Sequence, residues 1–75
     1  MPTVLIPLAS GSEELEAIAV VNVLRRAEID VFIASCEETE VVTCSRKTKI
    51  MCDVNINDVK DQEFDAIIIP GGVND

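Results

Sequence analysis

Glu16 is the acidic residue of this chain that is best placed to do chemistry. It stands near the start of an expected helix, between the apolar residues Leu15 and Ala17. Apolar surroundings favour the protonated form of a carboxyl group, whereas the N-terminus of a helix favours the ionised form. A carboxyl group balanced in this way can donate a hydrogen bond to a thiolate or take a proton from a substrate. The alternative is an ordinary first-turn glutamate facing water, which we expect of Glu13 and Glu14.

Gly71 and Gly72 form a second candidate feature, because with Pro70 they follow directly on the apolar run 66–69. A buried strand that leads into a Gly-Gly turn brings backbone N–H groups to the carboxyl edge of a sheet. Such donors can stabilise an oxyanion, so we expect both glycines to line a catalytic site. The alternative is a tight turn that needs glycine only for a positive φ.

Arg26 and Arg46 are candidate ligands for an anionic group of a substrate, because a guanidinium offers several donors in a planar fork. Arg26 stands at the end of the expected helix, and Arg46 stands in an expected turn. The alternatives are a helix C-terminal charge for Arg26 and a solvated turn for Arg46.

Three cysteines, Cys36, Cys44 and Cys52, are the remaining candidates for chemistry. Their odd number and the absence of an export signal favour reduced thiols and a cytoplasmic location. Cys44 and Cys52 flank an expected hairpin and could face each other across it in a redox role. Alternatively, they are small, half-buried strand residues. The chain has no histidine and no CxxC motif, so we expect no metal site.

Composition bounds the class of protein. At 75 residues the chain has room for one small domain, and 48% of its residues are hydrophobic. The net charge of −8 argues against binding to nucleic acid or to an anionic membrane surface. No apolar run approaches the ~20 residues needed to span a bilayer.

The order of expected elements predicts an α/β fold. An apolar strand, a helix and a second strand within about thirty residues form a βαβ unit with parallel strands. A hairpin, one helical turn near Asp58 and a last strand follow. Either Ser10 or Ser12 could cap the helix, and Ser10 with Glu13 fits a capping box. The expected strands are 3–8, 31–35, 41–44, 49–52 and 65–69, and the helix is 13–27.

The expected helix is apolar on nearly every side, although packing on one sheet needs only one apolar stripe. Its second apolar face needs a cover, either a partner subunit or a further segment of the fold. The apolar strand 66–69 also requires cover on both faces, as parallel strands do. The sequence therefore predicts an incomplete doubly wound α/β domain.

Together these residues resemble the ThiJ/PfpI superfamily, and within it the branch of parkinsonism-associated deglycases (DJ-one). The resemblance covers the whole chain, and its motifs are specific in combination and order rather than singly. They are Gly11-Ser12-Glu13-Glu14-Leu15-Glu16, Val23-Leu24-Arg25-Arg26-Ala27, Cys44-Ser45-Arg46 and Ile68-Ile69-Pro70-Gly71-Gly72.

The resemblance implies a flavodoxin-like, doubly wound parallel sheet, of which residues 1–75 are the amino-terminal part of a single domain. It also implies a homodimer with the first helix in the contact. In the family, a carboxylate at the position of Glu16 hydrogen-bonds a reactive cysteine. Backbone donors matching Gly71 and Gly72 face that cysteine. Arginines matching Arg26 and Arg46 line the pocket, one of them supplied by the partner subunit.

The nucleophilic cysteine of the family lies beyond Asp75. We therefore expect a carboxy-terminal remainder of the same protein, held together with this chain, to complete the site. The complete protein is expected to act as a glyoxalase or deglycase on methylglyoxal-like α-oxoaldehydes or their early adducts, without metal or organic cofactor. The alternative is an oxidative-stress sensor or redox-regulated chaperone, in which the same cysteine is oxidised to a sulfinate beside Glu16.

Overall fold

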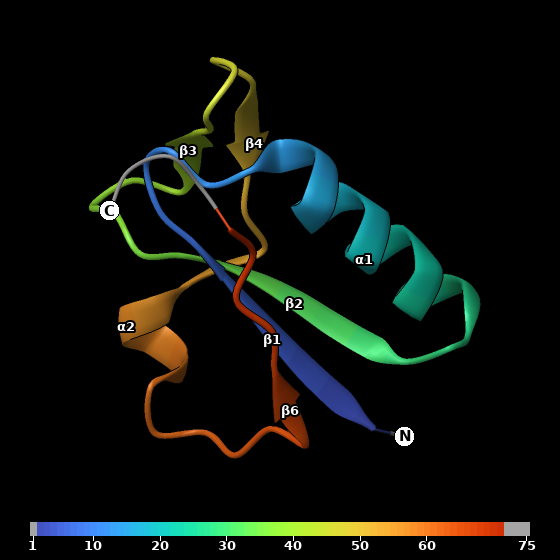
Figure 1. Cartoon of the computed structure of the whole chain (residues 1–75). Helices are drawn as coiled ribbons and strands as arrows, with labels where there is room; N and C mark the ends of the chain where they lie inside the picture. Colours follow the sequence, from blue (N-terminus) through green and yellow to red (C-terminus); the bar gives the residue numbers. More distant parts are fainter. Residues whose placement is uncertain (1, 72–75) are drawn as a thin grey trace.

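A four-stranded parallel sheet organises residues 2–71, the part of the chain that the computed structural model describes (Figure 1). The strand order is β5-β2-β1-β6, and β3 and β4 form a separate antiparallel hairpin. The elements are β1 (Thr3–Leu8), α1 (Glu14–Arg26), β2 (Asp30–Ser35), β3 (Val41–Thr43), β4 (Lys49–Met51), β5 (Val54–Asn55), α2 (Ile56–Val59) and β6 (Ala66–Ile67). This arrangement confirms the predicted α/β class with a parallel sheet.

The unit β1-α1-β2 forms the centre of the fold, as the sequence predicts. β1 and β2 pair in parallel along their whole length, from Thr3 opposite Asp30 to Leu8 opposite Ser35. In Figure 1 the two strands run side by side, with α1 on one side of the sheet and α2 on the other. Because β1 leads directly into α1, the N-terminal end of that helix lies at the carboxyl edge of the sheet.

The alternation of side chains along the strands divides the buried core between the two faces of the sheet. On the α1 face, Ile6 and Ile33 pack with Ala17 and Val21 of the helix. The hairpin closes the same face with Val42, which is fully buried. On the α2 face the core is smaller, and its buried members are Leu5, Ala34 and Val59.

Helix α1 differs from the prediction mainly at its start. The helix begins at Glu14, and its N-cap is Glu13, whose side chain accepts a hydrogen bond from the backbone N–H of Leu15 at 2.8 Å. The predicted capping box of Ser10 with Glu13 is therefore wrong. The other candidate cap, Ser12, accepts a hydrogen bond from the N–H of Ala9 and stabilises the turn before the helix instead.

The later strands also differ from the prediction. β6 covers only Ala66–Ile67 rather than 65–69, and Pro70 prevents its extension at the C-terminal end, because proline has no N–H to continue the ladder. β5 is absent from the predicted strands, and it pairs in parallel with the end of β2. The helical turn expected near Asp58 is confirmed as α2.

One side of α1 carries apolar residues that nothing in residues 2–71 covers. Leu15 is 76% exposed and Val23 is 63% exposed, whereas Ala17 and Val21 are buried against the sheet. The expected second apolar face of this helix is thus present and open in the described part of the chain. Neither described helix has the length and apolar composition needed to cross a membrane.

Candidate functional site

Gly71 is docked on the N-terminal end of α1, at the carboxyl edge of the sheet. Its N–H donates a hydrogen bond to Oε1 of Glu16 at 3.0 Å. Its carbonyl accepts a second hydrogen bond from the backbone N–H of Glu13 at 2.6 Å. The fold therefore brings together two residues that the sequence singled out, although they are 55 positions apart.

The close approach to Glu16 explains why a glycine suits position 71. A Cβ built on Gly71 would lie 3.3 Å from Oε1 of Glu16, so the carboxylate would have to shift to admit it. The backbone of Gly71 does not have the positive φ that favours glycine, so the tight-turn alternative is wrong for this residue. Gly72, the second predicted donor, lies outside the described residues.

The same contact changes the chemical role available to Gly71. Its N–H is engaged by Glu16, so in this arrangement it orients a carboxylate rather than serving as a free oxyanion donor. Among residues 2–71, the second oxygen of Glu16 accepts no hydrogen bond. The site therefore presents a carboxylate fixed through one oxygen and available through the other.

Glu14 holds the turn of the hairpin, a role that the sequence analysis missed. Its carboxylate accepts hydrogen bonds from Oγ of Ser45 at 2.8 Å and from the backbone N–H of Arg46, at 3.1 Å to each oxygen. The side chain of Thr48 interacts with the same carboxylate and lowers its pKa. We expected Glu14 to face water, and this expectation is wrong.

These contacts also determine the ionisation of Glu14. The interaction with Thr48, followed by hydrogen bonds from its own backbone, Ser45 and Arg46, outweighs partial burial and lowers the pKa of Glu14 from 4.5 to about 2. Glu14 is thus a carboxylate throughout the neutral pH range. The repeated acidic residues predict the start of a helix, but no local pattern predicts that Glu14 contacts residues 45–48.

The two predicted arginines lie at opposite ends of α1. Arg46 stands in the hairpin turn, where its backbone N–H is bound to the first turn of the helix. Arg26 is the last residue of α1, ten residues after Glu16, which corresponds to about 15 Å along a helix. Within one copy of residues 2–71, Arg26 therefore does not reach the site at Glu16.

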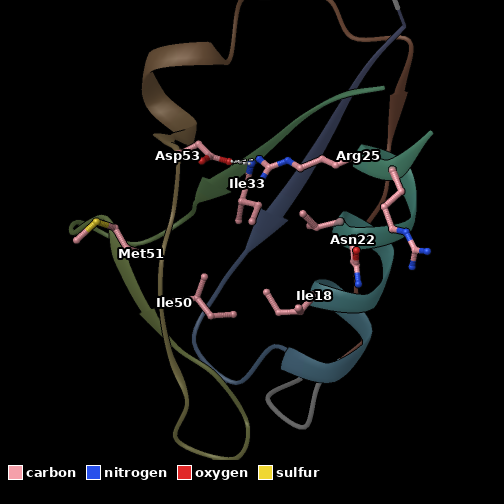
Figure 2. Close-up of a pocket in the computed structure, with 9 residues that line it drawn as sticks. Ile18, Asn22, Arg25, Ile33, Ile50, Met51 and Asp53 are labelled. Atoms are coloured by element: carbon pink, nitrogen blue, oxygen red, sulfur yellow. Dashed lines mark hydrogen bonds and ion pairs between the residues drawn. The ribbon is translucent and has the colours of Figure 1, made fainter. Parts of the chain in front are cut away.

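Arg26 instead borders an open groove between α1 and the hairpin, with a volume of about 550 Å³. Figure 2 shows Ile18 of α1 and Ile50 of β4 pointing toward each other across this groove. Arg25 extends over one end of the groove toward Asp53.

Arg25 and Asp53 form a second link between α1 and the rest of the fold, also missed from the sequence. Nη2 of Arg25 lies 2.9 Å from Oδ2 of Asp53 and donates to the carbonyl of Val31 at 2.8 Å. Asp53 also exchanges two hydrogen bonds with the backbone of Ile33, accepting through Oδ2 at 2.9 Å and donating its own N–H at 2.8 Å. Asp53 stands directly before β5, and its position gives no sequence signal for this pairing.

The described cysteines are poor nucleophiles. Burial, followed by nearby acidic groups, raises the pKa of the thiols of Cys36 and Cys44. The same causes raise the pKa of Cys52 to about 11, with burial again the largest. A raised pKa leaves little of the reactive thiolate at neutral pH.

The hairpin register corrects the expectation that Cys44 and Cys52 face each other. The backbone N–H of Cys44 bonds to the carbonyl of Thr48, and that of Cys52 bonds to the carbonyl of Glu40. The two cysteines therefore lie at opposite ends of the hairpin, although both side chains enter the same core. Within the described residues, no group of three potential metal ligands is close enough to hold an ion.

Comparison with known proteins consistently finds similarity to one family. The sequence profile of the DJ-1/PfpI family matches residues 2–75. "Protein DJ-1 homolog A" of Arabidopsis thaliana is 45% identical over 73 residues, which are 97% of this chain and 19% of the relative. "Glutathione-independent glyoxalase DJR-1.2" of Caenorhabditis elegans is 44% identical over 61 residues, 81% of this chain and 32% of the relative.

The fold agrees with solved structures of the same group. The structure titled "Toxoplasma gondii DJ-1, oxidized" superposes with a TM-score of 0.96 at 42% sequence identity, over 97% of this chain and 40% of that chain. The described strands and helices are thus part of a flavodoxin-like DJ-1/PfpI domain. The chain spans well under half the length of the relatives it matches.

Proposed function

The chain belongs to the DJ-1/PfpI family, and from this membership we propose that it forms part of a cysteine-dependent glyoxalase or deglycase. The substrates are methylglyoxal-like α-oxoaldehydes or their early adducts with amines or thiols. A glyoxalase among its relatives, 44% identical to this chain, supports the proposal.

One observation carries the proposal: the carboxylate of Glu16 is held by the N–H of Gly71 at the carboxyl edge of the sheet. Parallel α/β sheets bind ligands at this edge. A carboxylate fixed by a charge-assisted hydrogen bond keeps one geometry, which general acid–base catalysis requires. Glu16 therefore has the chemistry and the place of a proton-transfer group.

The proposed reaction needs no external oxidant or reductant. A cysteine thiolate adds to the aldehyde carbon of methylglyoxal and forms a C–S bond, and the aldehyde oxygen takes a proton. Glu16 then takes the proton of this carbon while the ketone oxygen gains a proton, which gives an enediol. Glu16 returns its proton to the second carbon as the oxygen on the first carbon loses its own. The first carbon becomes a thioester and the second an alcohol. Water hydrolyses the thioester, releasing lactate and restoring the thiol.

The nucleophilic cysteine of this proposal comes from a carboxy-terminal segment of the same protein, outside the described residues. The raised pKa of Cys44 and Cys52 supports this choice, because neither thiol supplies much thiolate at neutral pH. Arg46, and Arg26 of a partner subunit, would bind the carbonyl or carboxylate oxygens of the substrate.

The open apolar side of α1 supports a homodimer in the proposed protein. Leu15 and Val23 are large apolar side chains with most of their surface exposed, and a second copy would bury them. We place the protein in the cytoplasm, where a reducing environment suits the three free cysteines.

A second candidate function is an oxidative-stress sensor or redox-regulated chaperone. The similar structure from Toxoplasma gondii is named as an oxidised protein, and this oxidation of a relative supports the second candidate. In it, two equivalents of peroxide oxidise the cysteine to a sulfinate and are reduced to water, and the available oxygen of Glu16 shares a proton with the sulfinate group.

The test is the conversion of methylglyoxal to lactate by the intact protein that contains this chain. We expect Glu16→Ala to lower kcat/KM by at least ~100-fold, because a positioned acid–base group contributes 10²–10⁴-fold. Glu63→Ala is the matched control, because Glu63 is an exposed glutamate in the loop before β6, at the amino edge of the sheet and thus opposite the edge where Gly71 lies, and it should retain wild-type turnover.

Two results would contradict the proposal. Undiminished turnover in Glu16→Ala would remove Glu16 from the mechanism. Absence of lactate formation by the wild type, together with ready oxidation of a cysteine to a sulfinate by peroxide in mass spectrometry, would favour the sensor.

A further inference from the structure

The first turn of α1 holds two distant segments of the chain through two carboxylates of the same turn. Glu16 binds Gly71, whereas Glu14 binds the hairpin turn at Ser45 and Arg46. Residues two apart on a helix point to different sides. The two carboxylates therefore fix the strand exit and the hairpin turn on either side of one short stretch of backbone.

The hairpin turn is tied to this region by its backbone as well. The N–H of Ser45 donates to the carbonyl of Ser12 at 2.8 Å, and the N–H of Gly11 donates to the carbonyl of Thr43 at 3.1 Å. These bonds connect the β1–α1 loop to the hairpin on one side of Arg46. The bond from Arg46 itself reaches only Glu14, so the backbone at this residue depends on that carboxylate.

The turn is also closed internally. The N–H of Cys44 bonds to the carbonyl of Thr48, and the N–H of Lys47 bonds to the carbonyl of Cys44. Lys47 has a φ of 69°, a left-handed conformation that a lysine seldom adopts. The backbone of the turn is thus specified on both sides of Arg46, and the Glu14 carboxylate completes it at the centre.

We infer that Glu14 is a positioning residue that fixes the backbone of Arg46 and thereby directs its guanidinium to the substrate. This inference rests on the proposed function, in which Arg46 binds the carbonyl or carboxylate oxygens of an α-oxoaldehyde. Glu14 itself contacts no substrate. The low pKa of Glu14 means that the carboxylate and its hydrogen bonds persist at every pH at which the enzyme would work.

The test is a double-mutant cycle on methylglyoxal turnover by the intact protein, with Glu14→Gln, Arg46→Ala and the double variant. We expect Arg46→Ala to lower kcat/KM about tenfold, mainly through KM, since it removes hydrogen bonds from a charged donor. Glu14→Gln should give a smaller loss, about threefold to tenfold, also in KM. The double variant should be no worse than Arg46→Ala alone. Losses that multiply, or a loss in Glu14→Gln that appears only in kcat, would overturn the inference.

Amide hydrogen exchange gives a second readout that does not depend on activity. The N–H of Arg46 should be protected in the wild type, and its protection should fall in Glu14→Gln but not in the control Glu63→Gln. Unchanged protection in Glu14→Gln would overturn the inference even if the enzyme is active. If protection falls as expected but the wild type makes no lactate, the proposed function and the role of Glu14 in directing Arg46 to the substrate are both refuted, and only its structural hold on the turn remains.

Discussion

The two ends of helix α1 are both linked to distant parts of the chain, but by different chemistry. At the N-terminal end, Glu14 and Glu16 each accept hydrogen bonds from backbone N–H groups of other segments. At the C-terminal end, Arg25 forms an ion pair with Asp53, and both side chains remain more than 40% exposed. Backbone donors are held in place by the fold, whereas a surface ion pair must order two flexible side chains.

This difference supports the proposal that the N-terminal end of α1 is the end that takes part in function. The N-terminal end of a helix favours carboxylates, and here it meets the carboxyl edge of a parallel sheet. The C-terminal end lies about 15 Å from Glu16 along the helix and serves to attach α1 to β2 and to the segment after β4. Variants at the two ends should therefore affect different properties: activity at the first and, slightly, stability at the second.

The largest of these expected effects is a loss of activity in Gly71→Ala, which adds one methyl group beside Glu16. The added Cβ would lie 3.3 Å from Oε1 of Glu16, so the carboxylate must shift by a few tenths of an ångström. Because misplacement of a reacting group by about 1 Å can cost 10²-fold, we expect a loss of about tenfold in kcat. Steady-state kinetics with methylglyoxal measure it, and the melting temperature serves as the control. Wild-type kcat in a folded Gly71→Ala protein would show that the position of Glu16 is not critical.

A smaller effect concerns stability in acid. The pKa of Glu14 is about 2 in the folded protein and 4.5 ordinarily, so its contribution to stability is complete above pH 4.5 and is lost as the pH falls toward 2. Urea unfolding from pH 5 to pH 2 should therefore show a steeper loss of stability in wild type than in Glu14→Gln. Parallel stability curves for the two proteins would mean that the hydrogen bonds of Glu14 do not form in solution.

The smallest effect is expected at the C-terminal end, for Asp53→Asn. The substitution removes the ion pair with Arg25 but leaves an oxygen that can accept from the N–H of Ile33. Exposed ion pairs contribute about 0.2–1 kcal/mol, so the free energy of unfolding should fall by no more than about 1 kcal/mol. Denaturant titration measures this change. A fall of several kcal/mol in the free energy of unfolding would contradict the minor stabilising role given to the C-terminal end of α1.

Local sequence patterns predicted the parts of this structure that local interactions decide. The apolar runs and the helix between them gave β1, α1 and β2, because side-chain periodicity determines which faces can be buried. The same patterns predict site roles for the glycine after the last apolar run and for the glutamate on the apolar helix. The fold places these two in contact.

The features that were missed depend on tertiary contacts. Glu14 bonds to residues more than 30 positions away, and Asp53 bonds to a strand 20 positions before it. Neither partner can be identified from spacing. The N-cap was misplaced for a related reason: Ser12 is used within its own turn, which leaves Glu13 to cap the helix. Position 72 lies outside the described residues, so the prediction for Gly72 stays a prediction.

One comparison tests the central claim most directly: methylglyoxal turnover by the intact protein carrying Glu16→Gln, beside the same protein carrying Asp53→Asn. The account predicts a loss in kcat/KM of at least ~100-fold for Glu16→Gln, since glutamine keeps the size but cannot move the proton. It predicts turnover within about twofold of wild type for Asp53→Asn, whose ion pair is an exposed one. Equal losses for the two variants, or full activity of Glu16→Gln, would contradict the account.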